Sequence, residues 1–363
     1  MLRLDRLVGQ RPMSVSVAGG TTPLYSLRGA VPRTPASNEK LVLSMTLLSR
    51  FGPRYRIPTT LEGRSIDHGT VPGPLWLVGH GDPEVGPRTL RTLARAARMR
   101  GVRRVQGPVV GVTSTFTRER WAPGWTRIAL LFIGLPTALT FDQNEGPGGF
   151  VFDPERRAAA ALRADLRSVG IAVEGPARAE AGGARRGRKV LARVRSSDLI
   201  DILTRQNQSS LNLDAEVLTK MLGAASSGPP GSIAKGARAI EAWARRHGVA
   251  ATAHDGSGLS YRDRITTDGM VRLLALTGSQ RWSGALRSTL PASGEGTLAG
   301  RLVGVTVRAK TGTLLRRVSA LSGWVWMAHA RRWAEFSVFS RGLLKSRAVA
   351  LEDAIVRTLA TRA

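Results

Sequence analysis

The sequence predicts an α/β domain of the α+β kind that is interrupted by an insertion. A hairpin pattern and a helix open the chain, and strands and a helix close it. The pattern of expected helices and strands changes after Pro58 and changes back near Ser196. We therefore expect residues 1–58 and 196–363 to form one discontinuous domain, and residues 59–195 to form a largely β insertion.

The first part of the outer domain contains a hairpin and a helix. Serine and valine alternate over residues 14–17, two glycines follow at 19–20, and "PLYSLRG" returns the chain, which is typical of a β-hairpin. A helix is expected over about residues 35–50, because glycine and proline at 52–53 would end it.

The insertion is expected to hold strands and two helices. "LWLVGHGDP" (75–83) predicts a strand and a loop, and "VRRVQGPVVGV" (102–112) predicts one further strand. "RTLRTLARAARMRG" (88–101) predicts an amphipathic helix, and the segment 153–170 has the Asp-Pro start and glycine end of another. The low-complexity stretch "ARAEAGGARRGR" (177–188) predicts a flexible loop.

Compact structure is expected again beyond residue 196. Helices are predicted over about 197–206, 213–222 and 235–247. Alternating valines from 303 to 307 predict a strand, as do "ALSGWVWMAHA" and "AEFSVFS". An apolar stripe predicts a final helix through Ala348, Leu351, Ile355 and Leu359.

Composition limits the classes of function. The net charge of +28 favours polyanions or anionic membranes as neighbours, but the arginines are scattered as on a solvated surface. No aromatic-basic motif indicates nucleic acid, so anionic cell-wall polymers are the favoured polyanion. The absence of cysteine excludes disulfides, the five histidines show no metal-ligand spacing, and no apolar run is long enough to span a membrane.

Lysine is rare in this chain, with 6 lysines against 48 arginines. Arginine is effectively always protonated, whereas a buried lysine can lose its proton and act as a base. Lys40 follows Ser37 by three positions at the start of the first predicted helix, so the two side chains share a face. A second Ser-x-x-Lys, Ser232 to Lys235, lies in a loop of small residues, and its position favours Ser37 as the functional serine.

Two further motifs follow in order. Ser210-Leu211-Asn212 precedes a predicted helix, so a helix cap is the alternative to a functional role and is compatible with one. Lys310-Thr311-Gly312 lies in the strand "VRAKTGTL", where a lysine can also serve to protect a sheet edge from aggregation. Each motif is weak alone, but the order Ser-x-x-Lys, Ser-x-Asn, Lys-Thr-Gly is typical of penicillin-binding proteins and class A β-lactamases.

The residue types fit serine acyl transfer. A serine hydroxyl needs a base, and a neutral Lys40 can take the Ser37 proton if burial and the neighbouring Lys310 lower its pKa. The Ser37 N–H at a helix start can hold an oxyanion. Ser210 can relay a proton to the leaving group, while Asn212 can hold a substrate amide and orient Lys40.

The strand motif fits recognition of a terminal carboxylate. Lys310 with the Thr311 and Thr313 hydroxyls can bind such a carboxylate, and Gly312 permits a peptide to approach the strand edge closely. We therefore expect all three motifs to face one cleft.

Across nearly the whole chain the sequence resembles the class C low-molecular-mass penicillin-binding proteins, the D-alanyl-D-alanine carboxypeptidase and endopeptidase family. The segments that carry the resemblance are "PASNEKL", "NQSSLNLDAEVLTKMLG", "DGSGLS", "GTLAGR", "VRAKTGTLLRRVSALSGWV", "LWLVGHGDP" and "GVRRVQGPVVGVTSTF". The resemblance implies a transpeptidase/β-lactamase-like serine acyltransferase fold, with an antiparallel sheet flanked by helices and an inserted domain.

The resemblance also implies an activity. It implies a serine-type D-Ala-D-Ala carboxypeptidase, with endopeptidase activity as an option, that cleaves peptidoglycan stem peptides through an acyl-enzyme on Ser37. β-Lactams would acylate the same serine, no cofactor would be needed, and the N–H groups of Ser37 and Thr313 would form the oxyanion hole. The family acts outside the cytoplasmic membrane, yet no signal peptide is recognisable, so we expect a misplaced start or a processed chain.

The sequence departs from the family in two places. The 173 positions from Ser37 to Ser210 are few, so a third family domain is expected to be missing. Val112 stands where members often carry an acidic residue that reads the diaminopimelate end of the substrate, which leaves the preferred stem peptide open.

Two other classes of function remain as alternatives. One is a β-lactamase-like or esterase hydrolase of the same fold, although no asparagine follows Asn212, so the Glu-x-x-x-Asn loop of class A β-lactamases cannot exist. The other is a non-enzymatic basic protein that binds cell-wall or other polyanions, which would leave the ordered motifs unexplained.

Overall fold

An antiparallel sheet of five strands is built from both ends of the chain. The computed structural model describes residues 2–181 and 187–362, and in this sheet the strand order is β15-β16-β17-β1-β2. β1 pairs with β17 so that Met13 lies opposite Ser340. The strands are β1 (Met13–Gly19), β2 (Thr22–Leu27), β15 (Val307–Leu314), β16 (Val318–Met327) and β17 (Arg332–Arg341).

Helices cover both faces of this sheet because its buried side chains alternate between two cores. Leu321 and Val325 of β16 pack in the core that α1 and α10 share, whereas Ala320 and Trp324 point to the helices of the other face. The helices of the outer domain are α1 (Leu2–Val8), α2 (Glu39–Phe51), α5 (Leu199–Ser209), α6 (Asn212–Ser227), α7 (Ile233–Arg246), α8 (Thr267–Leu276), α9 (Ser283–Ser288) and α10 (Lys345–Arg362). Short elements complete it: η1 (Ala36–Asn38), η4 (Thr277–Ser279), η5 (Gly296–Leu298), β13 (Ala251–Thr252) and β14 (Arg264–Ile265).

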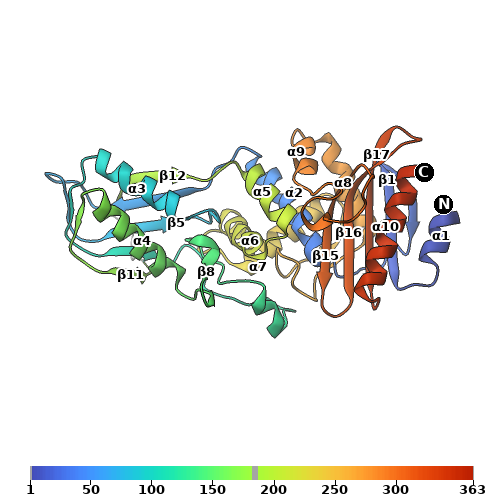
Figure 1. Cartoon of the computed structure of the whole chain (residues 1–363), viewed down its shortest axis with the longest axis horizontal. Helices are drawn as coiled ribbons and strands as arrows, with labels where there is room; N and C mark the ends of the chain where they lie inside the picture. Colours follow the sequence, from blue (N-terminus) through green and yellow to red (C-terminus); the bar gives the residue numbers. More distant parts are fainter. Residues whose placement is uncertain (1, 182–186, 363) are drawn as a thin grey trace.

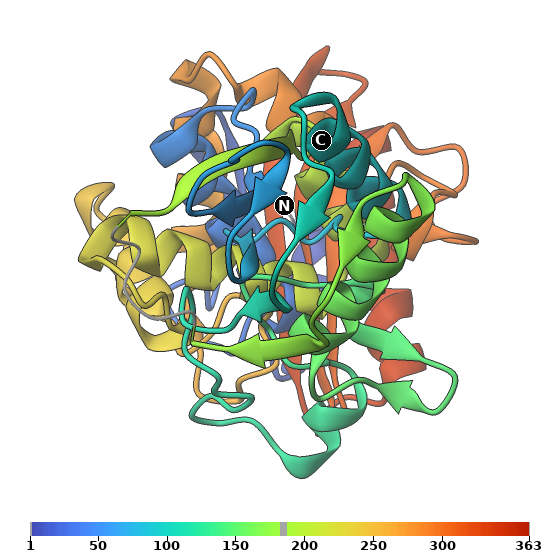
Figure 2. The same ribbon diagram turned by 90° about the vertical axis from the view of Figure 1, so that its left-hand side faces the viewer.

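Residues 58–195 form sheets of their own at the opposite end of the elongated molecule (Figure 1). Their main sheet is mixed, with strand order β11-β7-β5-β3-β12, and a short parallel sheet has the order β10-β6-β4. The two helices α3 and α4 pack with these strands in one separate core. Figure 2 looks onto this end of the molecule and shows these strands in front of the antiparallel sheet.

The elements of this segment have the following bounds. The strands are β3 (Pro58–Gly63), β4 (Thr70–Val71), β5 (Leu75–Gly79), β6 (Arg104–Val105), β7 (Val109–Val112), β8 (Glu145–Gly146), β9 (Gly149–Phe150), β10 (Ala172–Val173), β11 (Ala177–Glu180) and β12 (Lys189–Arg195). The helices are α3 (Pro87–Met99) and α4 (Pro154–Ser168), with short turns η2 (Arg127–Leu131) and η3 (Asp142–Asn144).

One stretch of this segment packs on the outer domain. Phe116, Trp125 and Ile133 belong to the same buried core as α2, α6 and α7. The buried Lys220 of α6 also donates hydrogen bonds to the carbonyl oxygens of Thr117 and Glu119. The stretch from Phe116 to Ile133 therefore attaches the segment 58–195 to helices α2, α6 and α7.

Most predicted elements are confirmed, and three local predictions are wrong. The stretch 102–112 forms two strands, β6 and β7, because Gly107 and Pro108 interrupt it. Residues 177–180 are a strand beside β7, and residues 182–186 of the predicted loop lie outside the described residues. The strand predicted from residue 303 begins only at Val307, since the backbone turns with positive φ at Leu302 and Gly304.

The apolar face of α3 is buried as predicted, through Leu90, Leu93, Ala94 and Ala97. No helix in residues 2–181 or 187–362 is both long and apolar enough to cross a membrane.

Candidate active site

Ser37 lies in a tight turn that leads into α2. The turn is the 3-10 helix η1, and Ala36 has a φ of +49° although it is not a glycine. Such a backbone is costly for residues with a side chain and is typical of functional sites. A Cβ on Gly312 of β15 would lie 2.9 Å from the Pro35 carbonyl oxygen and 3.0 Å from the Ser37 nitrogen, so glycine allows β15 to pass close over this turn.

Lys40 connects three parts of the site. It is fully buried, and its Nζ lies 3.3 Å from Ser37 Oγ, 2.8 Å from Asn212 Oδ1 and 2.6 Å from the Ser257 carbonyl oxygen. As an ammonium it donates a hydrogen bond to each oxygen. As a neutral amine it can donate to Asn212 and Ser257, which leaves its lone pair for the Ser37 hydroxyl proton.

The environment brings the pKa of Lys40 closer to neutral pH. Burial lowers the pKa of Lys40 to about 8, although nearby carboxylates, first Asp255 and then Glu216, act in the opposite direction. Lys310 is also fully buried, and burial followed by the charge of Lys40 holds its pKa well below the usual range. Burial is therefore the main cause of the lowered Lys40 pKa, and the repulsion between the lysines acts on Lys310.

This pKa predicts the pH dependence of acylation. Below about pH 8 Lys40 is protonated and has no lone pair, so the rate of Ser37 acylation is expected to rise with pH and level off above about pH 8. The measurement is the rate of penicillin adduct formation from about pH 6 to about pH 9.5, with thermal unfolding followed over the same range. A rate that stays constant or falls with rising pH would contradict this role of Lys40.

The Ser-x-Asn motif joins α5 to α6. Ser210 has left-handed backbone angles, with φ of 57° and ψ of 39°. The cap residue of α6 is Leu211, and no side chain caps this helix start, so the interpretation of the motif as a helix cap is wrong. Asn212 instead accepts from Lys40 and donates to the Phe132 carbonyl oxygen at 3.1 Å. The Ser210 hydroxyl makes no hydrogen bond within the described part of the chain.

The Lys-Thr-Gly motif lies on β15, the edge strand of the antiparallel sheet. Lys310 is buried beneath this strand and donates to the Thr311 carbonyl oxygen at 3.0 Å. The interpretation as a solvent-exposed protective lysine is therefore wrong. In the described residues no carboxylate pairs with Lys310, so its amine is available to a ligand.

The backbone of β15 points two amides outward. The Ala309 N–H points away from β16, because it donates to the Pro291 carbonyl oxygen at 3.2 Å. Alternate residues of an antiparallel strand share a direction, so the N–H groups of Thr311 and Thr313 face the same outer edge. Thr313 is exposed there, beside the Ser37 turn that packs under Gly312.

The second Ser-x-x-Lys has an ordinary structural explanation. The Ser232 side chain caps α7 by accepting from the Lys235 backbone N–H at 3.1 Å. The Lys235 amine donates to the carbonyl oxygens of Gly228 and Pro230, and among the described side chains it makes no hydrogen bond with Ser232 Oγ. This pair therefore has no activated hydroxyl.

Sequence reasoning missed a group of buried carboxyls behind Lys40. All four are fully or almost fully buried: Glu39, Glu216, Asp255 and Asp263. Of these four, Asp255 lies in the glycine-rich turn "HDGSGLS" (254–260), and Glu39 and Glu216 lie within the motif segments at Ser37 and Ser210. Within the described ranges, no group of three or more acidic or histidine side chains is arranged to hold a metal ion.

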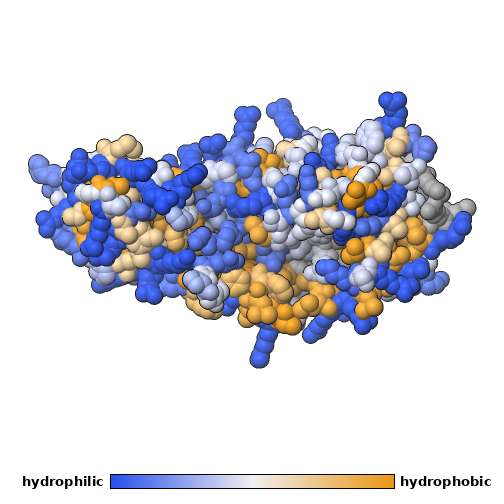
Figure 3. Space-filling view, in the orientation of Figure 1, coloured by the Kyte–Doolittle hydropathy of each residue, from blue (hydrophilic) through white to orange (hydrophobic). Residues whose placement is uncertain are grey.

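An apolar surface borders this site, and a cavity lies apart from it. Apolar side chains at the surface gather around η2 at the lower edge of the molecule (Figure 3), including Ile128, Leu131 and Phe132. The Phe132 carbonyl binds Asn212, so this apolar rim borders the site.

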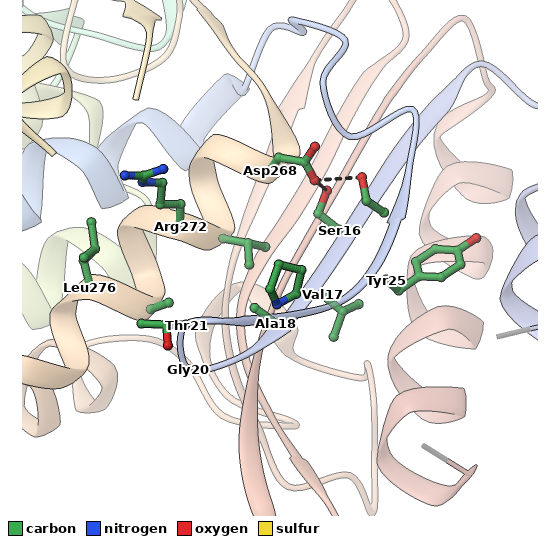
Figure 4. A pocket seen from close by; sticks show the side chains of 13 residues that line it. Ser16, Val17, Ala18, Gly20, Thr21, Tyr25, Asp268, Arg272 and Leu276 are labelled. Carbon is green, nitrogen blue, oxygen red and sulfur yellow. Dashed lines mark hydrogen bonds between the residues drawn. The ribbon is translucent and has the colours of Figure 1, made fainter. Parts of the chain in front are cut away.

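A cavity of about 480 Å³ lies between the β1–β2 hairpin and α8, lined by Val17, Tyr25 and Asp268 among others, and contains none of the candidate catalytic residues (Figure 4).

Comparison with solved structures places the fold. The structure superposes on penicillin binding protein 4 (dacB) from Haemophilus influenzae with a TM-score of 0.86, at 21% identity over 99% of this chain and 100% of that one. It also superposes on the penicillin G-acylated predatory endopeptidase Bd3459 from Bdellovibrio bacteriovorus, with a TM-score of 0.57 and 15% identity over 95% and 90% of the two chains. The predicted transpeptidase-like fold is thus confirmed.

Sequence comparison agrees with the fold. The D-alanyl-D-alanine carboxypeptidase of Actinomadura sp. (strain R39) is 27% identical over 429 residues, which cover 93% of this chain and 78% of that protein. Carboxypeptidase DacB of Mycolicibacterium smegmatis is 28% identical, over 83% of this chain and 70% of that protein. The sequence pattern of one family matches residues 6–148 and 148–362, nearly the whole chain, and the protein therefore belongs to the D-Ala-D-Ala carboxypeptidase 3 (S13) family.

Proposed function

We propose that this serine peptidase cleaves peptidoglycan stem peptides that end in D-Ala-D-Ala, with Ser37 as nucleophile and Lys40 as its base. The observation that carries the proposal is the buried Lys40 amine, which is held by Asn212 and Ser257 and faces the Ser37 hydroxyl. This arrangement provides a nucleophile, a base and a group that orients the base, which is the minimal set for covalent catalysis.

The reaction begins with attack on the penultimate residue of the peptide. Ser37 Oγ bonds to the carbonyl carbon of the penultimate D-alanine while its proton moves to the neutral Lys40 Nζ. The carbonyl oxygen becomes an oxyanion that the N–H groups of Ser37 and Thr313 stabilise. The outward direction of the Thr313 amide supports this assignment.

The terminal D-alanine then leaves. The tetrahedral intermediate collapses, the C–N bond breaks, and the departing amine takes the proton from Lys40 through the Ser210 hydroxyl. Among the residues that the structure describes, the Ser210 hydroxyl has no hydrogen-bond partner, which supports this relay. Water then attacks the Ser37 ester, and the shortened peptide is released with the proton returned to Ser37.

Lys310 selects the free end of the peptide. A terminal carboxylate that approaches the outer edge of β15 would stabilise the charged form of Lys310, which otherwise has no carboxylate partner in the described residues. The Thr311 and Thr313 hydroxyls would complete the carboxylate site. Val112 is buried at the end of β7, so other residues would recognise a side chain of the substrate.

A peptide pair tests this function. A stem peptide ending in D-Ala-D-Ala should release free D-alanine, while the same peptide with a C-terminal amide should react about 10- to 100-fold more slowly, because a charge-assisted hydrogen bond contributes about 1.5–3 kcal/mol. Free D-alanine is measured after incubation, with a cross-linked peptide dimer as the endopeptidase substrate. Equal rates for acid and amide would contradict the role of Lys310.

We also propose the division of the chain into domains. Residues 1–58 with 196–363 form the catalytic domain, and residues 59–195 form an accessory domain. The separate sheets and the separate core around α3 and α4 support this division, while Phe116, Trp125 and Ile133 pack in the core of the catalytic domain. The third family domain is missing, in keeping with a family match that breaks at residue 148 and an alignment of 429 residues against a chain of 363.

Since the family acts on peptidoglycan outside the cytoplasmic membrane, the net charge of +28 would hold the enzyme near anionic cell-wall polymers.

A further inference from the structure

A buried loop touches both the nucleophile turn and the base. The Ser257 carbonyl oxygen accepts from Lys40 Nζ at 2.6 Å. Gly258 has a φ of +77°, and a Cβ there would overlap the Ala36 carbonyl oxygen and lie 3.0 Å from the Ser37 nitrogen. A shift of this loop would therefore move the base relative to the nucleophile.

Glu216 of α6 holds this loop from the side opposite Lys40. Its Oε1 accepts from the backbone N–H groups of Gly256 at 3.0 Å and Ser257 at 2.7 Å. Glu216 and Ser257 are both fully buried. Thr219, one turn further along α6, fills the space where a Gly256 side chain would lie. Because Ser257 bonds Glu216 through its N–H and Lys40 through its C=O, the carboxyl position sets the position of that carbonyl.

The other end of the loop is held independently. Asp255 accepts from the N–H groups of Gly258 at 2.7 Å and Ser260 at 2.8 Å. Its Oδ2 also accepts from the indole N–H of Trp125 at 2.6 Å. With this end fixed, the part of the loop that faces Lys40 depends on Glu216.

We propose that Glu216 is a positioning residue for acylation: its carboxyl fixes the backbone at 256–257 so that the Ser257 carbonyl aims the Lys40 amine at Ser37. The inference rests on the proposed function, in which Lys40 is the base. In the described structure no hydrogen bond or ion pair joins Glu216 to Lys40, so Glu216 sets the position of Lys40 through the loop.

The shape of Glu216, more than its charge, performs this role. Its Oε2 has no hydrogen-bond partner among the described residues. Burial, followed by the charge of Asp255, raises the pKa of Glu216 to about 8, which favours its neutral form. A glutamine has the same length, the same accepting oxygen and no charge, whereas an aspartate is one methylene too short to reach both N–H groups.

Two variants separate position from charge. Glu216→Gln should form the penicillin adduct within about threefold of the parent rate, because the accepting oxygen stays in place. Glu216→Asp should be about 10- to 100-fold slower, since a displacement of about 1 Å at a catalytic group costs up to about 100-fold. With a D-Ala-D-Ala peptide the loss in Glu216→Asp should fall on kcat, while KM stays near the parent value.

Glu155→Asp is the matched control. Glu155 is a comparably buried glutamate that accepts from Arg118 at 2.7 Å in the segment 58–195, so its shortening tests general loss of packing. Thermal unfolding shows which variants are folded, and Glu155→Asp should keep the parent acylation rate.

Two results would overturn the inference: folded Glu216→Asp that acylates at the parent rate, or Glu216→Gln that is as slow as Glu216→Asp. If Glu216→Asp does not fold, Glu216→Gln decides alone, and a large loss of rate in that variant overturns the inference. A folded parent that takes up no penicillin would instead overturn the proposed function, and the inference with it.

Discussion

Ser37→Ala is expected to abolish the mass increase that penicillin causes in the folded protein. A β-lactam offers a strained amide and a carboxylate in an arrangement similar to the end of a D-Ala-D-Ala peptide, so Ser37 should open the ring and form an ester. The leaving group stays tethered and hinders water, and the chain lacks the deacylating loop of class A β-lactamases. The adduct should therefore persist for minutes or longer and be visible by intact mass.

Ser232→Ala is the control for this experiment. It removes the cap of α7 and should lower the free energy of unfolding by about 1 kcal/mol, while adduct formation stays intact. A folded parent protein that gains no mass, or a peptide map that places the adduct on Ser232, would show that the active site has been assigned wrongly.

Lys40→Arg should reduce the rate of acylation by about 10²- to 10⁴-fold, the usual contribution of a general base. Arginine keeps the positive charge and can donate to Asn212 and Ser257, but it cannot release a proton at working pH. The loss should therefore appear in the rate of adduct formation of a protein whose fold survives. The measurement is a time course of penicillin mass increase combined with thermal unfolding.

Lys220→Arg provides the same change at another buried lysine. Lys220 lies 3.5 Å from Glu119 and binds two carbonyl oxygens, so it serves to attach α6 to the segment around residue 119. Arginine there should lower stability through overpacking but leave the acylation rate of the folded protein unchanged. If Lys40→Arg acylates at a near-normal rate, another group must activate Ser37.

The parts of the site that share a helical turn or a strand were predictable from sequence. Ser37 and Lys40 are three positions apart, so helical geometry alone places one beside the other. The order of the three motifs then predicted that Asn212 would meet Lys40, and the structure brings those two side chains to 2.8 Å. The exact contacts of Ser210 and Thr313 with a substrate stay a prediction.

The remaining parts depend on contacts between distant residues, which no local pattern encodes. Lys40 and Ser257 are separated by 217 positions, and the hold of Glu216 on the same loop arises only when α6 packs beside it. The strand predicted from Val303 was wrong for a local reason. Alternating valines favoured a strand, but the positive φ at Gly304 turns the chain before Val307. Lys220 had no recognisable motif, so its structural role could not be expected.

Because β1 pairs with β17, the five-stranded sheet can form only late in the synthesis of the chain. The strand that begins at Met13 emerges from the ribosome early, but its partner, which ends at Arg341, is among the last segments to be made. Contacts of such long sequence separation form slowly and late. The catalytic sheet therefore cannot close on a nascent chain, and a peptide bond-cleaving centre arises only after nearly the whole polypeptide has been synthesised.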